Sequence, residues 1–126
     1  MTERVLLVSS SGPETRARIR DVVLAEGWRP GAPPADGALG FERGSLGRTV
    51  LLGVLAGKNF HLSLRITLEG SPEGTRIRYR PGPSEGGVLG GILGARLAQR
   101  QHESTLAALR TEFAGAGLLV GEEPGH

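Results

Sequence analysis

The amino-acid sequence predicts an α+β fold, with an antiparallel sheet of about five strands packed on one face by an N-terminal helix and a long C-terminal helix. Three observations predict it. Apolar and polar residues alternate along Phe60–Glu69, a turn sequence separates this stretch from Thr75–Arg80, and an amphipathic run fills the last third of the chain. A period of two is typical of strands with one buried face, whereas spacings of three and four are typical of helices. The predicted order of elements is β-α-β-β-β-β-α, in a single domain that spans residues 1–126.

A strand and a helix are predicted at the N-terminus. Arg4–Val8 is a short apolar run that ends in a Ser-Ser-Ser-Gly-Pro sequence, which is typical of a strand followed by a helix start. Ser11 and Glu14 have the spacing of a capping box, in which each side chain satisfies a backbone N–H of the other residue. The helix is expected to run as far as Glu26, because Gly27 can adopt the left-handed conformation that ends helices.

The central part of the chain is harder to assign. Residues 28–38 are rich in proline and glycine and are expected to form a loop. Ala38–Arg43 follows as an edge strand, with Leu39 and Phe41 turned toward the core. Ser45–Gly57 has apolar residues on both faces of a strand and on most of a helix, so periodicity leaves both open. Its β-branched residues favour a strand.

A hairpin of two strands, Phe60–Glu69 and Thr75–Arg80, is predicted around the turn at Gly70–Gly74. Alternation places four arginines on the outer face of this hairpin, which makes them a possible anion-binding site: Arg65, Arg76, Arg78 and Arg80. The net charge of only +2, the acidic neighbours and the lack of a stacking aromatic residue argue against nucleic acid as the partner. A solvated face whose charges compensate one another is the favoured interpretation.

The final helix is expected to begin after a glycine- and proline-rich connection at residues 81–87. One face of this helix carries small residues in its first half and large apolar residues in its second half, Gln99 to Phe113, which is expected to pack on the sheet. In the first half, small residues recur four apart, a spacing that lets another backbone approach closely. Residues 120–126 are expected to form a flexible tail. In architecture, a sheet that embraces a terminal helix resembles the helix-grip and TATA-binding-protein-like folds.

The first half of this final helix is the leading candidate for a functional surface. Its glycines can contact a partner or lie on the domain's own sheet, and in the second case its leucines are left facing outward. Because monomers rarely leave an apolar patch uncovered, we expect contact with a protein partner or with a second copy of the chain. The predicted interface consists of Leu89, Gly90, Gly91, Ile92, Leu93, Gly94 and Leu97.

Two alternative functions use apolar residues differently. A small carrier would hold an apolar ligand or lipid between the sheet and the final helix, in a site lined by Phe60, Leu62, Leu64, Leu106 and Phe113. Peripheral association with a membrane surface would use Val88–Leu97, which falls far short of the roughly 20 apolar residues that a membrane span needs.

Catalytic, cofactor-binding and metal-binding patterns are not found in the sequence. There is no cysteine, and His61, His102 and His126 are scattered without carboxylates at metal-ligand spacing. Gly53–Asn59 differs from a phosphate-binding P-loop in its glycine spacing and in its last residue. We therefore expect a protein without enzymatic activity, cofactor or metal. A chain without cysteine and with only short apolar runs suits the cytoplasm.

Overall fold

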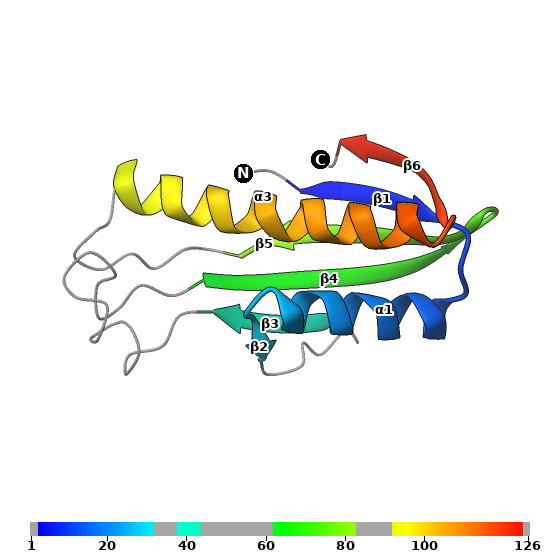
Figure 1. The fold of residues 1–126 in the computed structure, drawn as a ribbon, viewed down its shortest axis with the longest axis horizontal. Coiled ribbons are helices and arrows are strands. Elements are labelled where there is room, and N and C mark those ends of the chain that lie inside the picture. The colour runs from blue at the N-terminus through cyan, green and yellow to red at the C-terminus, as the bar shows by residue number, and fades with distance from the viewer. Residues whose placement is uncertain (1–2, 32–37, 44–61, 83–91, 125–126) are drawn as a thin grey trace.

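The computed structural model describes residues 3–31, 38–43, 62–82 and 92–124. Its elements are β1 (Arg4–Val8), α1 (Gly12–Ala25), β2 (Arg29–Pro30), β3 (Leu39–Arg43), β4 (Leu62–Ser71), β5 (Gly74–Pro81), α3 (Ile92–Gly115) and β6 (Leu119–Pro124). In the described part of the chain the strands form one antiparallel sheet in the order β2-β3-β4-β5-β1-β6. Both helices lie across one face of this sheet (Figure 1). The predicted α+β class is confirmed, and the strand predicted in Ser45–Gly57 lies outside the described residues.

The first helix, α1, is capped by Ser11 as predicted, while the carboxylate of Glu14 contacts Nε of Arg18. The backbone N–H of Glu14 donates a hydrogen bond to Oγ of Ser11 at 3.3 Å, which satisfies one of the free donors of the first turn. Pro13 stands in that turn and has no N–H to satisfy. Gly27 follows the helix with a φ of 99°, a backbone conformation that favours glycine. The buried side chains of α1 are Thr15, Ile19 and Val23.

The hairpin of β4 and β5 forms the centre of the sheet. Its pairing runs from Leu64 opposite Pro81 to Ser71 opposite Gly74. The predicted alternation of buried and accessible residues along β4 is confirmed from Leu62 to Ile66. Buried residues of both strands face the helices and join a single, mainly aliphatic core. The sheet residues of this core include Leu62, Leu64, Ile66, Ile77 and Tyr79.

The predicted flexible tail at residues 120–126 is wrong as far as Pro124. Leu119–Pro124 forms β6, which pairs antiparallel with β1 at the edge of the sheet. The register shifts between Leu7 and Val8, so that Val120 has no partner on β1. Such a β-bulge breaks the alternation of period two. Because this alternation is the signal that identifies a strand in a sequence, β6 is not recognisable there.

The predicted loop at residues 28–38 also contains a strand. Arg29 and Pro30 form β2, which pairs with Glu42 and Phe41 of β3. A two-residue strand is too short to show alternation, and proline is tolerated here because β2 lies at an edge of the sheet. As a consequence, β3 lies between β2 and β4 and is not the edge strand that the sequence predicts.

The long helix α3 packs on the sheet through its later turns. The side chains buried along it lie three or four residues apart from Ala98 onward, as predicted for the stretch from Gln99 to Phe113. Figure 1 shows the first turns of α3 extending past the ends of the labelled strands. The buried side chains of α3 among those described are Ala98, His102, Thr105, Leu106, Leu109 and Phe113.

Candidate functional site

The predicted interface on the final helix is described only in part. Leu89, Gly90 and Gly91 lie outside the described residues. Ile92, Leu93 and Gly94 form the beginning of α3, and Leu97, one turn further, is half-buried. Arg96 and Gln99, which flank Leu97 and Ala98, are exposed. Leu97 is therefore a half-buried leucine between exposed polar side chains near the start of α3. The first turns of this helix extend past the ends of the labelled strands (Figure 1).

The residues predicted to line a ligand cavity are members of the core. Leu62, Leu64, Leu106 and Phe113 are each at most 2% exposed and belong to one packed cluster, whereas Phe60 lies outside the described residues. Side chains that fill a core at this burial already contact one another. An apolar ligand between sheet and α3 would therefore have to displace these contacts.

The four arginines of the predicted anion-binding face lie on the side of the sheet that faces away from the helices. Arg65 is opposite Arg80, and Arg76 is opposite Glu69, across the β4–β5 ladder. Arg78 lies on β5 between Arg76 and Arg80, so alternation gives it the same side. We call this side, with its four arginines and the acids that contact them, the arginine face. Spacing within the hairpin does not reveal these acids, because Glu3 stands just before β1 and Glu123 belongs to β6.

Ion pairs compensate most of the charge on the arginine face. Glu3, just before β1, receives Nη1 of Arg78 at one carboxylate oxygen and Nε of Arg80 at the other, each at 2.8 Å. Its side chain is only 6% exposed. Arg80 first and then Arg78 hold the pKa of the Glu3 carboxyl below its usual value, against the opposing effect of burial. Arg78 also contacts Glu69 at 3.2 Å.

A hollow of about 350 Å³ opens at one end of the arginine face. Its lining comes from β3, β4 and β5 and from two glycines beside them, Gly31 and Gly82. Arg65, Arg80 and Ser63 contribute polar groups to the lining, and Glu42 contributes a carboxylate. A glycine-lined hollow with a few converging polar groups has the character of a small-ligand site.

A buried polar cluster joins the sheet to α3 on the other face. Oη of Tyr79 and Nδ1 of His102 lie 2.7 Å apart, and Nε1 of Trp28 donates a hydrogen bond to Oγ1 of Thr105 at 2.9 Å. The rings of Trp28 and His102 are in contact, with centroids 5.4 Å apart. Burial lowers the pKa of His102 to about 4 and raises the pKa of the Tyr79 hydroxyl. His102 is therefore neutral at pH 7 and is used in packing.

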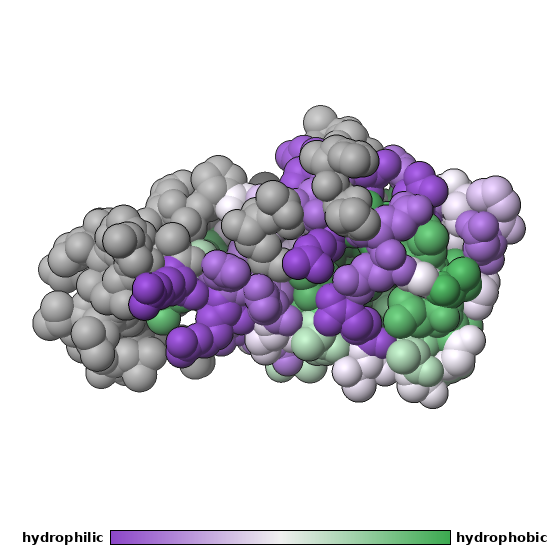
Figure 2. All heavy atoms as spheres, turned by 90° about the horizontal axis from the view of Figure 1, so that it is seen from above, coloured by the Kyte–Doolittle hydropathy of each residue, from purple (hydrophilic) through white to green (hydrophobic). Residues whose placement is uncertain are grey.

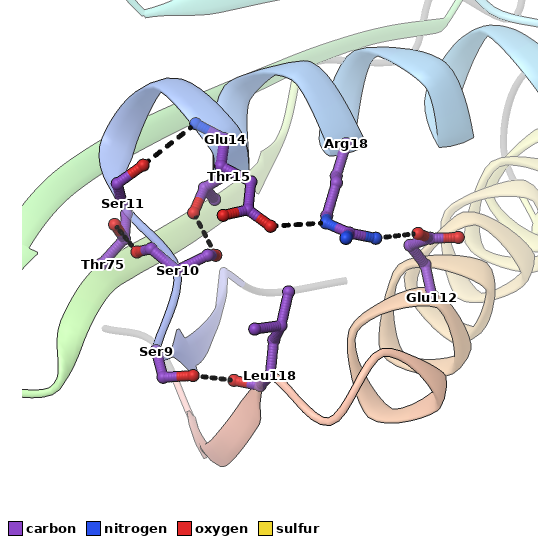
Figure 3. A network of polar contacts seen from close by, with 9 residues as sticks. All are labelled: Ser9, Ser10, Ser11, Glu14, Thr15, Arg18, Thr75, Glu112 and Leu118. Atoms are coloured by element: carbon purple, nitrogen blue, oxygen red, sulfur yellow. Dashed lines mark hydrogen bonds and ion pairs between the residues drawn. The ribbon is translucent and has the colours of Figure 1, made fainter.

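Polar contacts also connect α1 to the sheet and to α3 (Figure 3). Nη1 of Arg18 contacts Glu112 of α3 at 2.7 Å, while its Nε contacts Glu14 at 3.2 Å. Oγ of Ser10 lies 2.6 Å from Oγ1 of Thr15, and Oγ1 of Thr75 donates to the backbone oxygen of Ser10 at 2.8 Å. The serines after β1 are thus engaged in holding the helix start in place.

Figure 2 shows that apolar side chains gather near one end of the face it displays, and that polar ones cover much of the rest of its coloured surface. Figure 1 places the turn from α3 into β6 at the same end of the molecule. Leu118 and Leu119 are half-buried against the core there, while Val120 in the bulge is 51% exposed. One exposed valine on an edge strand, with Glu122 and Glu123 shortly after it, does not form an extended apolar surface.

The described residues contain no group of three or more histidines, aspartates or glutamates placed to hold a metal ion. No helix in the described ranges is both long enough and apolar enough to cross a membrane. No protein-family model matches the chain, and no curated protein matches it either.

Proposed function

We propose that this chain is a non-catalytic assembly module that binds a second copy of itself, and that the first turns of α3 form the contact surface. The observation that carries the proposal is that the first turns of α3, which begins at Ile92, extend past the ends of the labelled strands (Figure 1). Leu97, near this end of the helix, is only half-buried.

Helical turns outside the sheet need another contact to be stable. Short isolated helices are marginal in water, and a glycine such as Gly94 costs a helix about 1 kcal/mol relative to alanine. Leu97 presents part of its side chain beside the exposed Arg96. A second copy packed against these turns would bury Leu97 further, and the small residues next to it would let the two helices approach closely.

The chemistry of the buried groups supports a binding role rather than catalysis. Tyr79 and His102 have the most strongly perturbed pKa values among the described residues, and they are bonded to each other inside the core. A catalytic pair would have to reach a substrate. We also propose a helix-grip or TATA-binding-protein-like architecture, which the two described helices on one face of an antiparallel sheet support. We propose a cytoplasmic location as well, which the lack of cysteine supports.

Light scattering coupled to size-exclusion chromatography tests the proposal. The wild-type protein is expected to have the mass of a dimer or a larger assembly, and Leu93→Glu and Leu97→Glu are expected to lower this mass to that of a monomer. Ala114→Glu is the matched control, because Ala114 is exposed near the opposite end of the same helix. It adds the same charge to α3 and is expected to leave the mass unchanged.

Two results would contradict the proposal. A wild-type protein with monomer mass at all concentrations would exclude self-association. An assembly that both glutamate variants leave intact would show that the first turns of α3 are not its contact surface. Circular dichroism of each variant separates a lost contact from a lost fold.

A further inference from the structure

The arginine face contains two arginines directly opposite each other. Arg65 on β4 and Arg80 on β5 are partners in the antiparallel ladder, and directly opposed residues have Cβ atoms about 5 Å apart. Like charges at this separation repel unless acids lie near them, and Glu3 supplies one carboxylate to Arg80. The pair therefore brings two guanidinium groups together at one place on the arginine face.

The acid that contacts Arg80 is shared. Glu3 divides its two carboxylate oxygens between Arg80 and Arg78, and the side chain of Arg80 remains 52% exposed. A guanidinium group has five N–H donors, of which the contact with Glu3 uses Nε. Arg80 can thus keep its ion pair with Glu3 and still donate to a second oxyanion.

Glycines border the hollow beside this pair. Gly40 on β3 is the partner of Arg65 on the side away from Arg80, so the row across the three strands is glycine, arginine, arginine. In the next row, Gly82 donates its backbone N–H to the carbonyl oxygen of Ser63 at 2.9 Å. A Cβ at Gly82 would collide with Oγ of Ser63. A side chain at Gly82 would therefore displace the Ser63 hydroxyl, which lines the hollow of about 350 Å³.

We propose that this hollow binds a small oxyanion, held by the guanidinium groups of Arg65 and Arg80 with the hydroxyl of Ser63 as a further donor. The shared chemistry is a carboxylate or phosphate group, because planar guanidinium donors match both in geometry. Glu42, also at the border, contacts Arg29 at 4.0 Å, which offsets its charge. The proposal does not depend on self-association, since it uses the sheet face that α3 does not cover.

NMR titration of the full-length protein with inorganic phosphate, and separately with butyrate, tests the proposal at constant ionic strength. The side-chain Nε–Hε signals of Arg65 and Arg80 are expected to shift and to saturate with at least one of these probes. Arg65→Gln and Arg80→Gln are each expected to raise the apparent Kd about tenfold, as the loss of one charge-assisted hydrogen bond implies. Which probe saturates identifies the chemical class of the natural ligand.

Two variants distinguish specific binding in the hollow from nonspecific electrostatic attraction of anions to the arginine face. Arg76→Gln removes the same charge from the same face outside the hollow and is expected to change the apparent Kd less than about twofold. Gly82→Ala keeps every charge but displaces the Ser63 hydroxyl, with which its Cβ would collide, and it is expected to weaken binding as much as Arg65→Gln does. If neither probe saturates, or if Arg76→Gln weakens binding as much as Arg65→Gln, the hollow is not an oxyanion site.

Discussion

Tyr79 and His102 are joined across the interface between the sheet and α3, with Oη of Tyr79 only 2.7 Å from Nδ1 of His102. Both residues are at most 2% exposed. The neutral imidazole can accept a hydrogen bond from the Tyr79 hydroxyl at Nδ1, in which case its own hydrogen is on Nε2. In this arrangement the bond sets the tautomer of His102, while burial of the ring keeps it neutral at pH 7.

Removal of the Tyr79 hydroxyl is expected to destabilise the protein. Tyr79→Phe keeps the ring but leaves Nδ1 of His102 buried without its donor, which costs about 1 to 3 kcal/mol of unfolding free energy. Thr105→Val is expected to cost a similar amount, because it leaves the indole N–H of Trp28 without an acceptor. Urea unfolding followed by the fluorescence of Trp28, the single tryptophan, measures both. Wild-type stability in Tyr79→Phe would show that water replaces the lost hydroxyl.

Stability is expected to fall in mild acid because of His102. The pKa of His102 is about 4 in the folded protein against a usual value of 6.5. A lowered histidine pKa means that the unfolded chain binds the proton more tightly than the folded protein does. The unfolding free energy is therefore highest above pH 6.5 and decreases as the pH falls toward 4. The loss is on the order of 3 kcal/mol at pH 4.

A pH series of urea unfolding curves measures this loss, and His102→Gln is the control. Glutamine is neutral at every pH of the series, so the variant is expected to lose less stability between pH 6.5 and 4 than the wild type does. Protonation of Glu3 also lowers the unfolding free energy, at lower pH, because the pKa of Glu3 is lowered in the folded protein and its ion pairs are lost on protonation. Parallel curves for wild type and His102→Gln would assign the acid sensitivity to other groups.

Local patterns in the sequence were sufficient to predict the elements whose interacting residues are close along the chain. The alternation from Leu62 to Ile66 and the cap formed by Ser11 and Glu14 depend on neighbouring residues, and both are present in the structure. The bulge at Val120 and the two-residue β2 do not produce a periodic signal, so β6 and β2 were not predicted. They form because β1 and β3 each have a free edge to pair with.

The acids of the arginine face could not be predicted for a similar reason. Glu3 lies far from Arg78 and Arg80 in the sequence and reaches them only because β1 pairs with β5. Alternation with the buried Leu6 does place Glu3 on the arginine face, which is the one signal that the sequence contained. The interface predicted on the first half of the final helix remains a prediction, since Leu89, Gly90 and Gly91 lie outside the described residues.

The shared carboxylate of Glu3 is expected to matter more than the exposed one of Glu69. Glu3→Gln removes the charge that two arginines contact from a side chain that is 6% exposed, whereas Glu69 contacts one arginine and is 42% exposed. Exposed ion pairs contribute little because water and salt screen them. Glu3→Gln is therefore expected to lower the unfolding free energy by more than Glu69→Gln does, in parallel urea titrations. Equal losses would mean that burial of Glu3 does not strengthen its contacts.

Two glycines of the β4–β5 hairpin are expected to respond in opposite ways to alanine. Gly74 has a φ of 148°, and a Cβ there would lie 2.6 Å from the backbone oxygen of Val8, whereas a Cβ at Gly70 would meet nothing within 4 Å. Gly74→Ala forces either the turn or the end of β1 to move and is expected to cost about 2 kcal/mol or more.

Gly70→Ala serves as the matched control in the same hairpin. It restricts only the unfolded chain and is expected to leave the unfolding free energy within about 0.5 kcal/mol of the wild type or slightly above it. Thermal and urea unfolding of the two variants measure the difference directly. Because β1 is the strand that Gly74 approaches, the loss in Gly74→Ala is expected to be accompanied by faster amide exchange along β1. Unchanged exchange there, with equal stability of the two variants, would show that Gly74 does not require its close contact with Val8.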